Sequence, residues 1–336
     1  IAQIATSMIT TIRKLASEML PHIRRILAIF FLAILNYFPA THFGWMGYYI
    51  GTLLRQGLAV AFLTASSPPE VRINPERNSS AELPFWPQIF DMVFKAGILD
   101  ATTCYTLVHL KWGGFIVDDG SDWPSGEYSL LASVIRAVAY FYMVFVCKSF
   151  VWEVIFDFFH YWTHRLAHAN KTLYNLIHFD HHLHEHPSAL SCYSLTIMDI
   201  ILTNALPVSL SFALCPFTWT PLQFHVLFAF KTALEVGGHC GIAGTDSWSF
   251  LQFPPLKYIL PICLHVSDHD LHHTNVTMNF SKRFKLWDLV FGTYKSPEEV
   301  SRARLMRRVN VRMIILGLWD SIRGSTSGGR GSSVVP

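Results

Sequence analysis

Two long stretches of the sequence contain no charged side chain, and they limit what the chain can fold into. Residues 26–54 and 200–230 each run for about 30 residues without Asp, Glu, Lys or Arg, and a helix needs roughly 20 apolar residues to cross a bilayer. The composition agrees, since 51% of the residues are hydrophobic and 15% are charged. Charge-free runs in soluble helical cores usually end near about 10 to 14 residues. The sequence therefore favours an integral membrane protein.

Both stretches contain prolines, which interrupt helices because they lack a backbone N–H donor. We therefore expect the second stretch to form a hairpin of two helices, near 198–215 and 221–236. A third apolar region, 129–147, leads into a helix that continues towards His164. Together these segments predict an all-α membrane bundle with about four spanning helices in hairpins, capped by a histidine-rich helical region.

The sequence divides into four regions. Residues 1–25 carry apolar side chains at helical spacing, which is typical of an amphipathic helix lying at a membrane surface. Residues 26–128 hold membrane segments and loops, and residues 129–298 hold most of the histidines. Residues 299–336 begin with several arginines and end in Gly/Ser-rich sequence that we expect to be disordered.

Charge and cysteine content narrow the function further. The formal net charge is only +3, too small to indicate binding of nucleic acid. Lys and Arg nevertheless gather near the histidine-bearing segments, and the positive-inside rule then predicts that this half faces the cytosol. The six cysteines form no CxxC pair, so we expect reduced thiols rather than a disulfide framework.

Histidines concentrate in one part of the chain, and fourteen of the seventeen lie between positions 160 and 273. They form three patterns, His-x-x-x-His at 164–168 and His-x-x-His-His at 178–182 and 269–273. Residues three or four apart share one face of a helix, so each pattern directs its rings the same way. One histidine on an apolar face is usually a hydrogen-bonded core residue, but so many buried neutral imidazoles would each need a partner. The patterns therefore predict a metal site.

The number of imidazoles indicates two ions, because the three patterns supply more ligands than one zinc ion accepts. Imidazole binds Zn, Fe, Cu and Ni alike, so the ligands themselves do not choose the metal. Acids between the histidines are expected either to accept the second ring N–H or to lie at the solvated surface. These acids are Asp180, Glu185, Asp268 and Asp270.

The three patterns resemble the histidine boxes of the fatty acid hydroxylase and sterol desaturase superfamily. They read HRLAH, HFDHH and HDLHH, in the superfamily's order, and the similarity covers about residues 150–294. In detail, DFFHYWTHRLAH is similar to sterol C4-methyl oxidases, GGHCG contains a further family histidine, and FKLWDLVFGTY is similar to the closing segment of the domain. Sphingoid-base hydroxylases share much of this pattern.

The resemblance implies a set of metal ligands, with no catalytic residue beyond them. The ligands are His164, His168, His178, His181, His182, His239, His269, His272 and His273, with His160 and His265 as candidate additions. Two departures put one family contact in doubt. Many relatives carry His-Pro-x-Glu where this chain has TIMD at 196–199, and sterol oxidases have a further histidine where Asp268 stands. His265 is a candidate substitute, whereas His184, His186 and His225 could be either metal-site or structural residues.

The resemblance also implies an activity. Residues 129–298 would form a catalytic domain that holds two iron ions, with zinc as a substitute in purified protein, and uses O2 and external electrons to oxidise a C–H bond of a lipid. A sterol oxidised in the manner of C4-methyl oxidases is the first candidate substrate. The alternatives are a sphingoid-base or fatty acid hydroxylase and a sterol C5 desaturase, and a membrane metal transporter is the alternative from another class.

Partners and location follow from the same resemblance. The electron donor would be cytochrome b5 or its reductase, which would suit the basic residues between 282 and 312. The protein would cross the endoplasmic reticulum membrane several times, with the histidine boxes facing the cytosol.

Overall fold

The computed structural model describes residues 2–66, 69–74, 85–112, 130–242, 249–303 and 305–306. Within these ranges it contains helices, short helical turns and two isolated β-bridges, and no strand. The chain divides into two units, Ile1–Tyr294 and Lys295–Pro336, and all three histidine patterns lie in the first. The predicted all-α fold is confirmed for the described residues.

The helical segments of the first unit follow one another with short connections. In chain order they are α1 (Ala2–His42), α2 (Gly44–Ala65), η1 (Pro69–Val71), α3 (Phe85–Phe90), η2 (Asp91–Gly97), α4 (Ile98–His109), α5 (Leu130–Ala167), α6 (Lys171–Leu173), η4 (Tyr174–His178), α7 (Phe179–His182), η5 (Ser191–Tyr193), α8 (Ile197–Asp199), η6 (Ile200–Ala205), α9 (Leu206–Leu214), α10 (Pro221–Gly238), α11 (Leu256–Ile259), α12 (Val266–Thr274) and α13 (Leu286–Val290). Three of them, η2, η4 and η6, are π-helical, a rare form that often occurs at functional sites.

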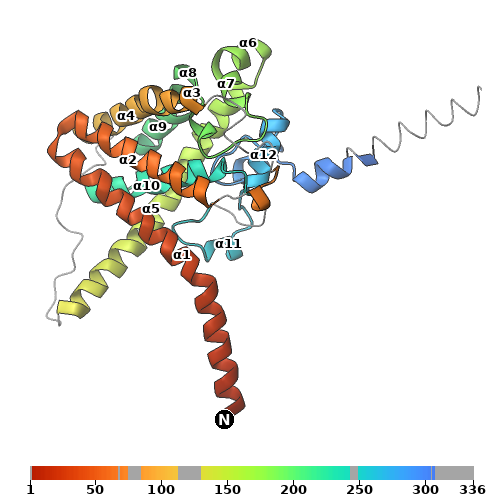
Figure 1. Ribbon diagram of the computed structural model, residues 1–336. Coiled ribbons are helices and arrows are strands. Elements are labelled where there is room, and N and C mark those ends of the chain that lie inside the picture. Colours follow the sequence, from red (N-terminus) through yellow and green to blue (C-terminus); the bar gives the residue numbers. More distant parts are fainter. Residues whose placement is uncertain are drawn as a thin grey trace, which may run out of the picture. The chain divides into compact units, whose positions relative to one another are not determined.

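Helices α1 and α2 form a tight antiparallel hairpin that turns at Phe43 (Figure 1). Gly44 has a φ of +54°, a conformation that residues with a Cβ atom rarely adopt. At the next turn of α2, a Cβ atom on Gly47 would lie 1.9 Å from the carbonyl oxygen of Pro39. The two helices can approach this closely only because Gly47 has no side chain.

Three helices in the described ranges are long and apolar enough to cross a bilayer, namely His22–His42, Val134–Ala167 and Ile197–Leu214. The sequence predicts about four, because it counts α10 as the second helix of a hairpin. In the structure nearly every residue of α10 is buried, and the helix packs against α1, α2 and α12. The predicted membrane bundle is confirmed, with α10 as an internal helix enclosed by the others.

Two predicted boundaries can be compared with the structure. α1 is one helix from Ala2 to His42 and continues through Pro21, so the predicted boundary at residue 25 lies inside it. The break between α9 and α10 falls where the prolines predict it. The predicted disordered end of the chain lies outside the described residues.

The arrangement of the helices brings distant histidine patterns together. α5 packs along α9 and also contacts η4, while α10 contacts α12. As a result α7 and α12, which are far apart in the sequence, lie on the same side of the bundle (Figure 1).

Candidate metal centre

Separate elements deliver the nine predicted ligands to one place. The C-terminal end of α5 and the residue directly after it carry the first histidine pattern, η4 and α7 carry the second, and α12 carries the third. His239 is the residue at which α10 ends. Because η4 is π-helical, its widened turn presents His178 beside the histidines of α7.

The nine histidines form two groups, and within each group the ligand nitrogens all lie within 4.8 Å of one another. Each group combines histidines from several elements, so neither could form within one helix. The first group is His164, His168, His178, His182 and His272, and the second is His181, His239, His269 and His273.

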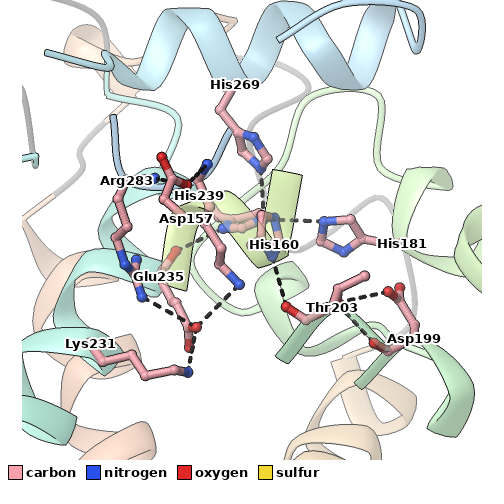
Figure 2. Close-up of polar contacts among 11 residues, drawn as sticks. Asp157, His160, His181, Asp199, Thr203, Lys231, Glu235, His239, His269 and Arg283 are labelled. Carbon is pink, nitrogen blue, oxygen red and sulfur yellow. Dashed lines mark hydrogen bonds and ion pairs between the residues drawn. The ribbon is translucent and has the colours of Figure 1, made fainter. Parts of the chain in front are cut away.

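In the second group the Nε2 atoms face one another. His239 Nε2 lies 3.2 Å from His181 Nε2 and 2.9 Å from His269 Nε2 (Figure 2). His273 Nε2 lies 3.2 Å from His269 Nε2. Four rings from three parts of the chain therefore point their outer nitrogens at one point.

Backbone carbonyls determine which nitrogen of these rings carries the proton. His239 Nδ1 lies 2.7 Å from the carbonyl oxygen of Glu235, and His273 Nδ1 lies 2.9 Å from that of His184. A carbonyl can only accept a hydrogen bond, so each Nδ1 carries the hydrogen. In the neutral ring each Nε2 then has a lone pair directed into the group.

The first group has the same construction. His164 Nε2 and His178 Nε2 are 2.9 Å apart. His164 Nδ1 donates to the carbonyl oxygen of Phe280 at 2.7 Å, and His272 Nδ1 donates to that of Met278 at 2.7 Å. The lone pairs of these rings therefore converge as they do in the second group.

Converging lone pairs about 3 Å apart repel one another unless a cation lies between them. A metal ion bound about 2.1 Å from each imidazole nitrogen places neighbouring ligand atoms about 3 Å apart. His168 also has no hydrogen-bond partner at either ring nitrogen among the described residues. The donor set and its spacing thus fit one transition-metal ion in each group.

Burial keeps the rings in the form that binds metal. Loss of solvent lowers the pKa of His239 and His272 from 6.5 to about 4 and, helped by the charge of a protonated His272, that of His168 to about 2. The pKa values of His181 and His269 are lowered well below the ordinary range by burial and then by neighbouring imidazoles. These imidazoles are neutral near pH 7, and neutral imidazole is the ligand that a metal requires.

The loop after α12 is fixed by two carboxylates. Asp157 on α5 accepts hydrogen bonds from the backbone N–H groups of residues 282–284 at 2.7 to 3.1 Å. Asp288 accepts those of Phe280 and Ser281 at 2.9 and 2.8 Å. Both carboxylates are fully buried, so they hold the loop whose carbonyl groups orient the first histidine group.

Asp199 is a site residue that the sequence reasoning missed. Its carboxylate accepts a hydrogen bond from His178 Nδ1 at 2.7 Å and another from the Thr203 hydroxyl at 3.0 Å. The signal was present in the segment TIMD, because Asp199 ends this segment where relatives end His-Pro-x-Glu with a glutamate. A shorter carboxylate therefore stands at this position and holds His178.

The acids predicted to accept the second ring N–H of a ligand histidine have other positions or partners. Asp268 accepts from the backbone N–H of His265 at 2.9 Å and caps the start of α12. Asp270 accepts from His186 Nδ1 at 2.9 Å, and Asp180 is exposed. The alternative of a surface position is correct for Asp180, whereas Asp268 and Asp270 support the segments around the site.

The additional histidines have separate positions. His160 borders the first group and donates from Nδ1 to the Thr203 carbonyl at 2.7 Å, but it belongs to neither group. His265 is half-buried at the start of α12 and also belongs to neither group. His225 is hydrogen bonded to Asn36 at 3.0 Å between α10 and α1, which is a structural role.

A cluster of ions lies behind the second group. The Glu235 carboxylate lies 2.5 Å from Lys231 Nζ, 3.2 Å from Lys282 Nζ and 3.5 Å from Arg283 Nη2 (Figure 2). The Arg283 side chain is only 1% exposed. Lys282 and Arg283 therefore face inward, which corrects the prediction that they belong to a basic docking surface.

One cavity borders both histidine groups. His164 and His178 of the first group and His181, His239 and His269 of the second line it. All three π-helical segments contribute to its wall, through Ala96 of η2, His178 of η4 and Asn204 of η6 among others. A molecule in this cavity would lie directly beside ions held by the two groups.

Comparison with known proteins agrees with the histidine patterns over part of the chain. Residues 149–293 match the family model described as Fatty acid hydroxylase. The predicted resemblance to the fatty acid hydroxylase and sterol desaturase superfamily is confirmed over these residues. They contain all nine histidines of the two groups.

Individual relatives are similar over about the same part of the chain. The C-4 methylsterol oxidase of Schizosaccharomyces pombe is 31% identical over 163 residues, which are 46% of this chain and 51% of that protein. The sphingolipid C4-hydroxylase of the same organism is 28% identical over 53% of this chain and 57% of that protein. A very-long-chain aldehyde decarbonylase of Oryza sativa subsp. indica is 28% identical over 41% of this chain and 22% of that protein.

The chain spans about half the length of the first two of these relatives. No solved structure matches it.

Proposed function

We propose that this chain is a membrane-bound oxygenase that holds two iron ions and oxidises a C–H bond of a lipid with O2 and external electrons. The observation that carries the proposal is the convergence of imidazole Nε2 atoms in two groups beside one cavity. The relatives support it, because they are named as lipid oxidases and hydroxylases. Their names favour an enzyme over a metal transporter.

The proposed ligands are the nine histidines of the two groups. Bound iron would supply the activation of O2 and the attack on an unactivated C–H bond. The chain supplies the other functions: the carbonyls of Phe280 and Met278 and the carboxylate of Asp199 orient the ligand rings. Burial of the rings excludes bulk water from the reacting atoms.

A sterol oxidised at or beside carbon 4 is the first proposed substrate, and a sphingoid base is the second. The two classes share a chemical feature. In a 4-methylsterol the carbon next to carbon 4 bears a hydroxyl group, and in sphinganine the carbon next to carbon 4 also bears one. A cavity for either substrate therefore has to accept a polar group close to the oxidised carbon.

The location and donor are proposed from the resemblance. The protein would lie in the endoplasmic reticulum membrane with the histidine groups towards the cytosol. Cytochrome b5 or its reductase would supply the electrons. The exposed Arg302 lies in the predicted basic segment and would suit an acidic donor.

Lipid profiling with a metal count tests the proposal. The chain is expressed in a yeast host, and the purified protein is expected to contain two iron ions while the host accumulates an oxidised sterol. His272→Ala should abolish the product and lower the iron content, since His272 belongs to the first group. His109→Ala alters an exposed histidine at the end of α4 and should change neither. Iron-free protein, or an unchanged lipid profile with iron-loaded protein and a supplied donor, would contradict the proposal.

A further inference from the structure

The cavity beside the two histidine groups contains polar atoms that the metal site does not use. Gln56, Tyr193 and Asn204 line this cavity. In each of them one polar side-chain atom, the amide oxygen of Gln56 and Asn204 and the hydroxyl of Tyr193, is buried and has no hydrogen-bond partner among the described residues. Gln56 is 3% exposed and Tyr193 is 5% exposed. Buried polar groups are normally hydrogen bonded, so three unpartnered groups on one cavity indicate a polar ligand.

These three groups come from different elements that meet at the cavity. Gln56 lies on α2, Tyr193 ends η5, and Asn204 lies in the π-helical segment η6. The residue before Asn204 is Thr203, whose carbonyl accepts from His160 at the edge of the first histidine group. The unpartnered groups therefore share a wall with the rings of the metal site.

The charged groups at the cavity already have partners. Asp100 is paired with Arg55, and Glu235 is paired with three cations, Lys231, Lys282 and Arg283. No carboxylate lining this cavity among the described residues lacks a cation. The groups left to bind a ligand are uncharged, which suits a hydroxyl group better than an ammonium group.

Burial keeps Tyr193 able to donate. It raises the pKa of the phenol well above its ordinary value of 10, so the group stays protonated. Two carbonyl acceptors and one phenolic hydroxyl can together donate to and accept from a single alcohol.

We propose that Gln56, Tyr193 and Asn204 form a hydroxyl subsite, which binds an uncharged hydroxyl group of the lipid and so presents a carbon close to that hydroxyl to the metal centre. The hydroxyl subsite rests on the proposed function. It adds to that function the residues that select the substrate. The hydroxyl subsite favours a 4-methylsterol, whose polar group is an alcohol, over sphinganine, which also carries an ammonium group.

Equilibrium binding tests the subsite without relying on turnover. The probes are a radiolabelled 4-methylsterol, its 3-deoxy analogue and sphinganine, each added to the purified full chain in detergent. The wild type should bind the 4-methylsterol more tightly than the 3-deoxy analogue. Tyr193→Phe should reduce that preference by about two- to tenfold, the range expected for one hydrogen bond between uncharged groups, and should leave the affinity for the 3-deoxy analogue unchanged.

A matched control removes a phenolic hydroxyl elsewhere. Tyr49 donates to the Val93 carbonyl and does not line the cavity, so Tyr49→Phe should keep the wild-type preference. Gln56→Leu tests a second member of the subsite with a side chain of similar size. It should also lower the preference for the hydroxylated probe.

Each result has a separate meaning. Equal binding of the two sterols by the wild type, or equal loss of both in Tyr193→Phe, overturns the subsite. Tighter binding of sphinganine than of the 4-methylsterol overturns the assignment to an uncharged hydroxyl. If the preference and its loss are observed but iron-loaded protein turns over no sterol, the subsite stands and the proposed function fails.

Discussion

A neutral imidazole has one protonated and one unprotonated nitrogen, so the partner of the first decides where the lone pair of the second points. Four rings of the two groups, those of His164, His239, His272 and His273, donate to backbone carbonyls, which allow only one tautomer. His178 is the exception, because its Nδ1 donates to the carboxylate of Asp199. A carboxylate also increases the basicity of the ring it holds.

Replacing Asp199 with Asn should weaken the metal centre without unfolding the chain. The amide keeps the size of the side chain but loses the negative charge that orients His178. Loss of such a supporting carboxylate typically lowers metal affinity or activity by about 10- to 100-fold. Iron content after dialysis against a chelator measures the effect.

Asp180→Asn is the matched control, because Asp180 lies two residues after His178 and is exposed. It should retain wild-type iron. Equal iron retention in the two variants would show that Asp199 does not support the centre.

For single residues, the sequence predicts which side chains belong to the site better than it predicts which groups those side chains contact. The nine predicted ligands can be named from the sequence, eight because spacing and resemblance both mark them and His239 because the resemblance marks it. The carbonyls of Phe280 and Met278 cannot, since every residue has a carbonyl and only the folded loop decides which one faces a ring. Asp199 is an intermediate case. The sequence shows that its segment departs from the family pattern, but it does not show that Asp199 contacts a histidine of the site.

At the scale of elements, α10 combines a ligand with an ion cluster. Its last turn places the Glu235 carbonyl against His239 and the Glu235 side chain against three cations. The same residue therefore links the metal centre to the loop that carries Lys282 and Arg283.

Glu235→Gln should destabilise the fold because it leaves buried cations without a counter-charge. Removing one partner of a buried ion pair typically costs about 3–5 kcal/mol in the free energy of unfolding. Denaturant unfolding of the purified chain measures this. Glu70→Gln changes an exposed glutamate and should cost less than about 1 kcal/mol, whereas similar losses in both variants would contradict the role of the cluster.

In the hairpin of α1 and α2, two Gly→Ala substitutions should change the stability of the fold in opposite directions. Gly47→Ala should destabilise the chain, because the new Cβ would meet the Pro39 carbonyl and separating packed elements typically costs about 1–3 kcal/mol. Gly57→Ala lies on the same helix with nothing within 4 Å of the added atom. It should stabilise by about 0.5–1 kcal/mol. Thermal unfolding of both variants decides, and a stabilising Gly47→Ala would show that the helices are further apart.

The prolines in the sequence predict one of the helix boundaries. The break between α9 and α10 contains Pro216 and a capping threonine, Thr220, and it is found where expected. Pro21 lies within α1 and does not end it, although proline disfavours a helix through its missing donor and its ring. The internal position of α10 was not predictable, since its apolar composition suits lipid and protein surroundings equally.

At the scale of the whole molecule, the bundle buries many neutral imidazole rings close together in its interior. Large apolar side chains such as Phe31, Phe38 and Phe62 remain exposed on α1 and α2, as expected for surfaces that face lipid. Around the site, the interior of the bundle is more polar than these exposed surfaces. The stability of the fold therefore depends on the charge state of the buried histidines.

Metal-free protein should lose stability as the pH falls below about 6.5. His184, His239 and His272 have folded-state pKa values near about 4, lowered by burial from 6.5. Between these values the unfolded chain binds more protons than the folded chain, so the stabilisation is complete above pH 6.5 and declines towards pH 4. Each such histidine contributes about 1.4 kcal/mol per pH unit within that window.

Thermal unfolding of the metal-free chain from pH 7.5 to 5 measures this loss, and the melting temperature should fall steeply below pH 6.5. Metal-loaded protein is the control, because a bound ion competes with protons for the same lone pairs and should move the decline to lower pH. A melting temperature that stays level down to pH 5 in metal-free protein would mean that the histidines are not buried together, and the two groups could not hold their ions.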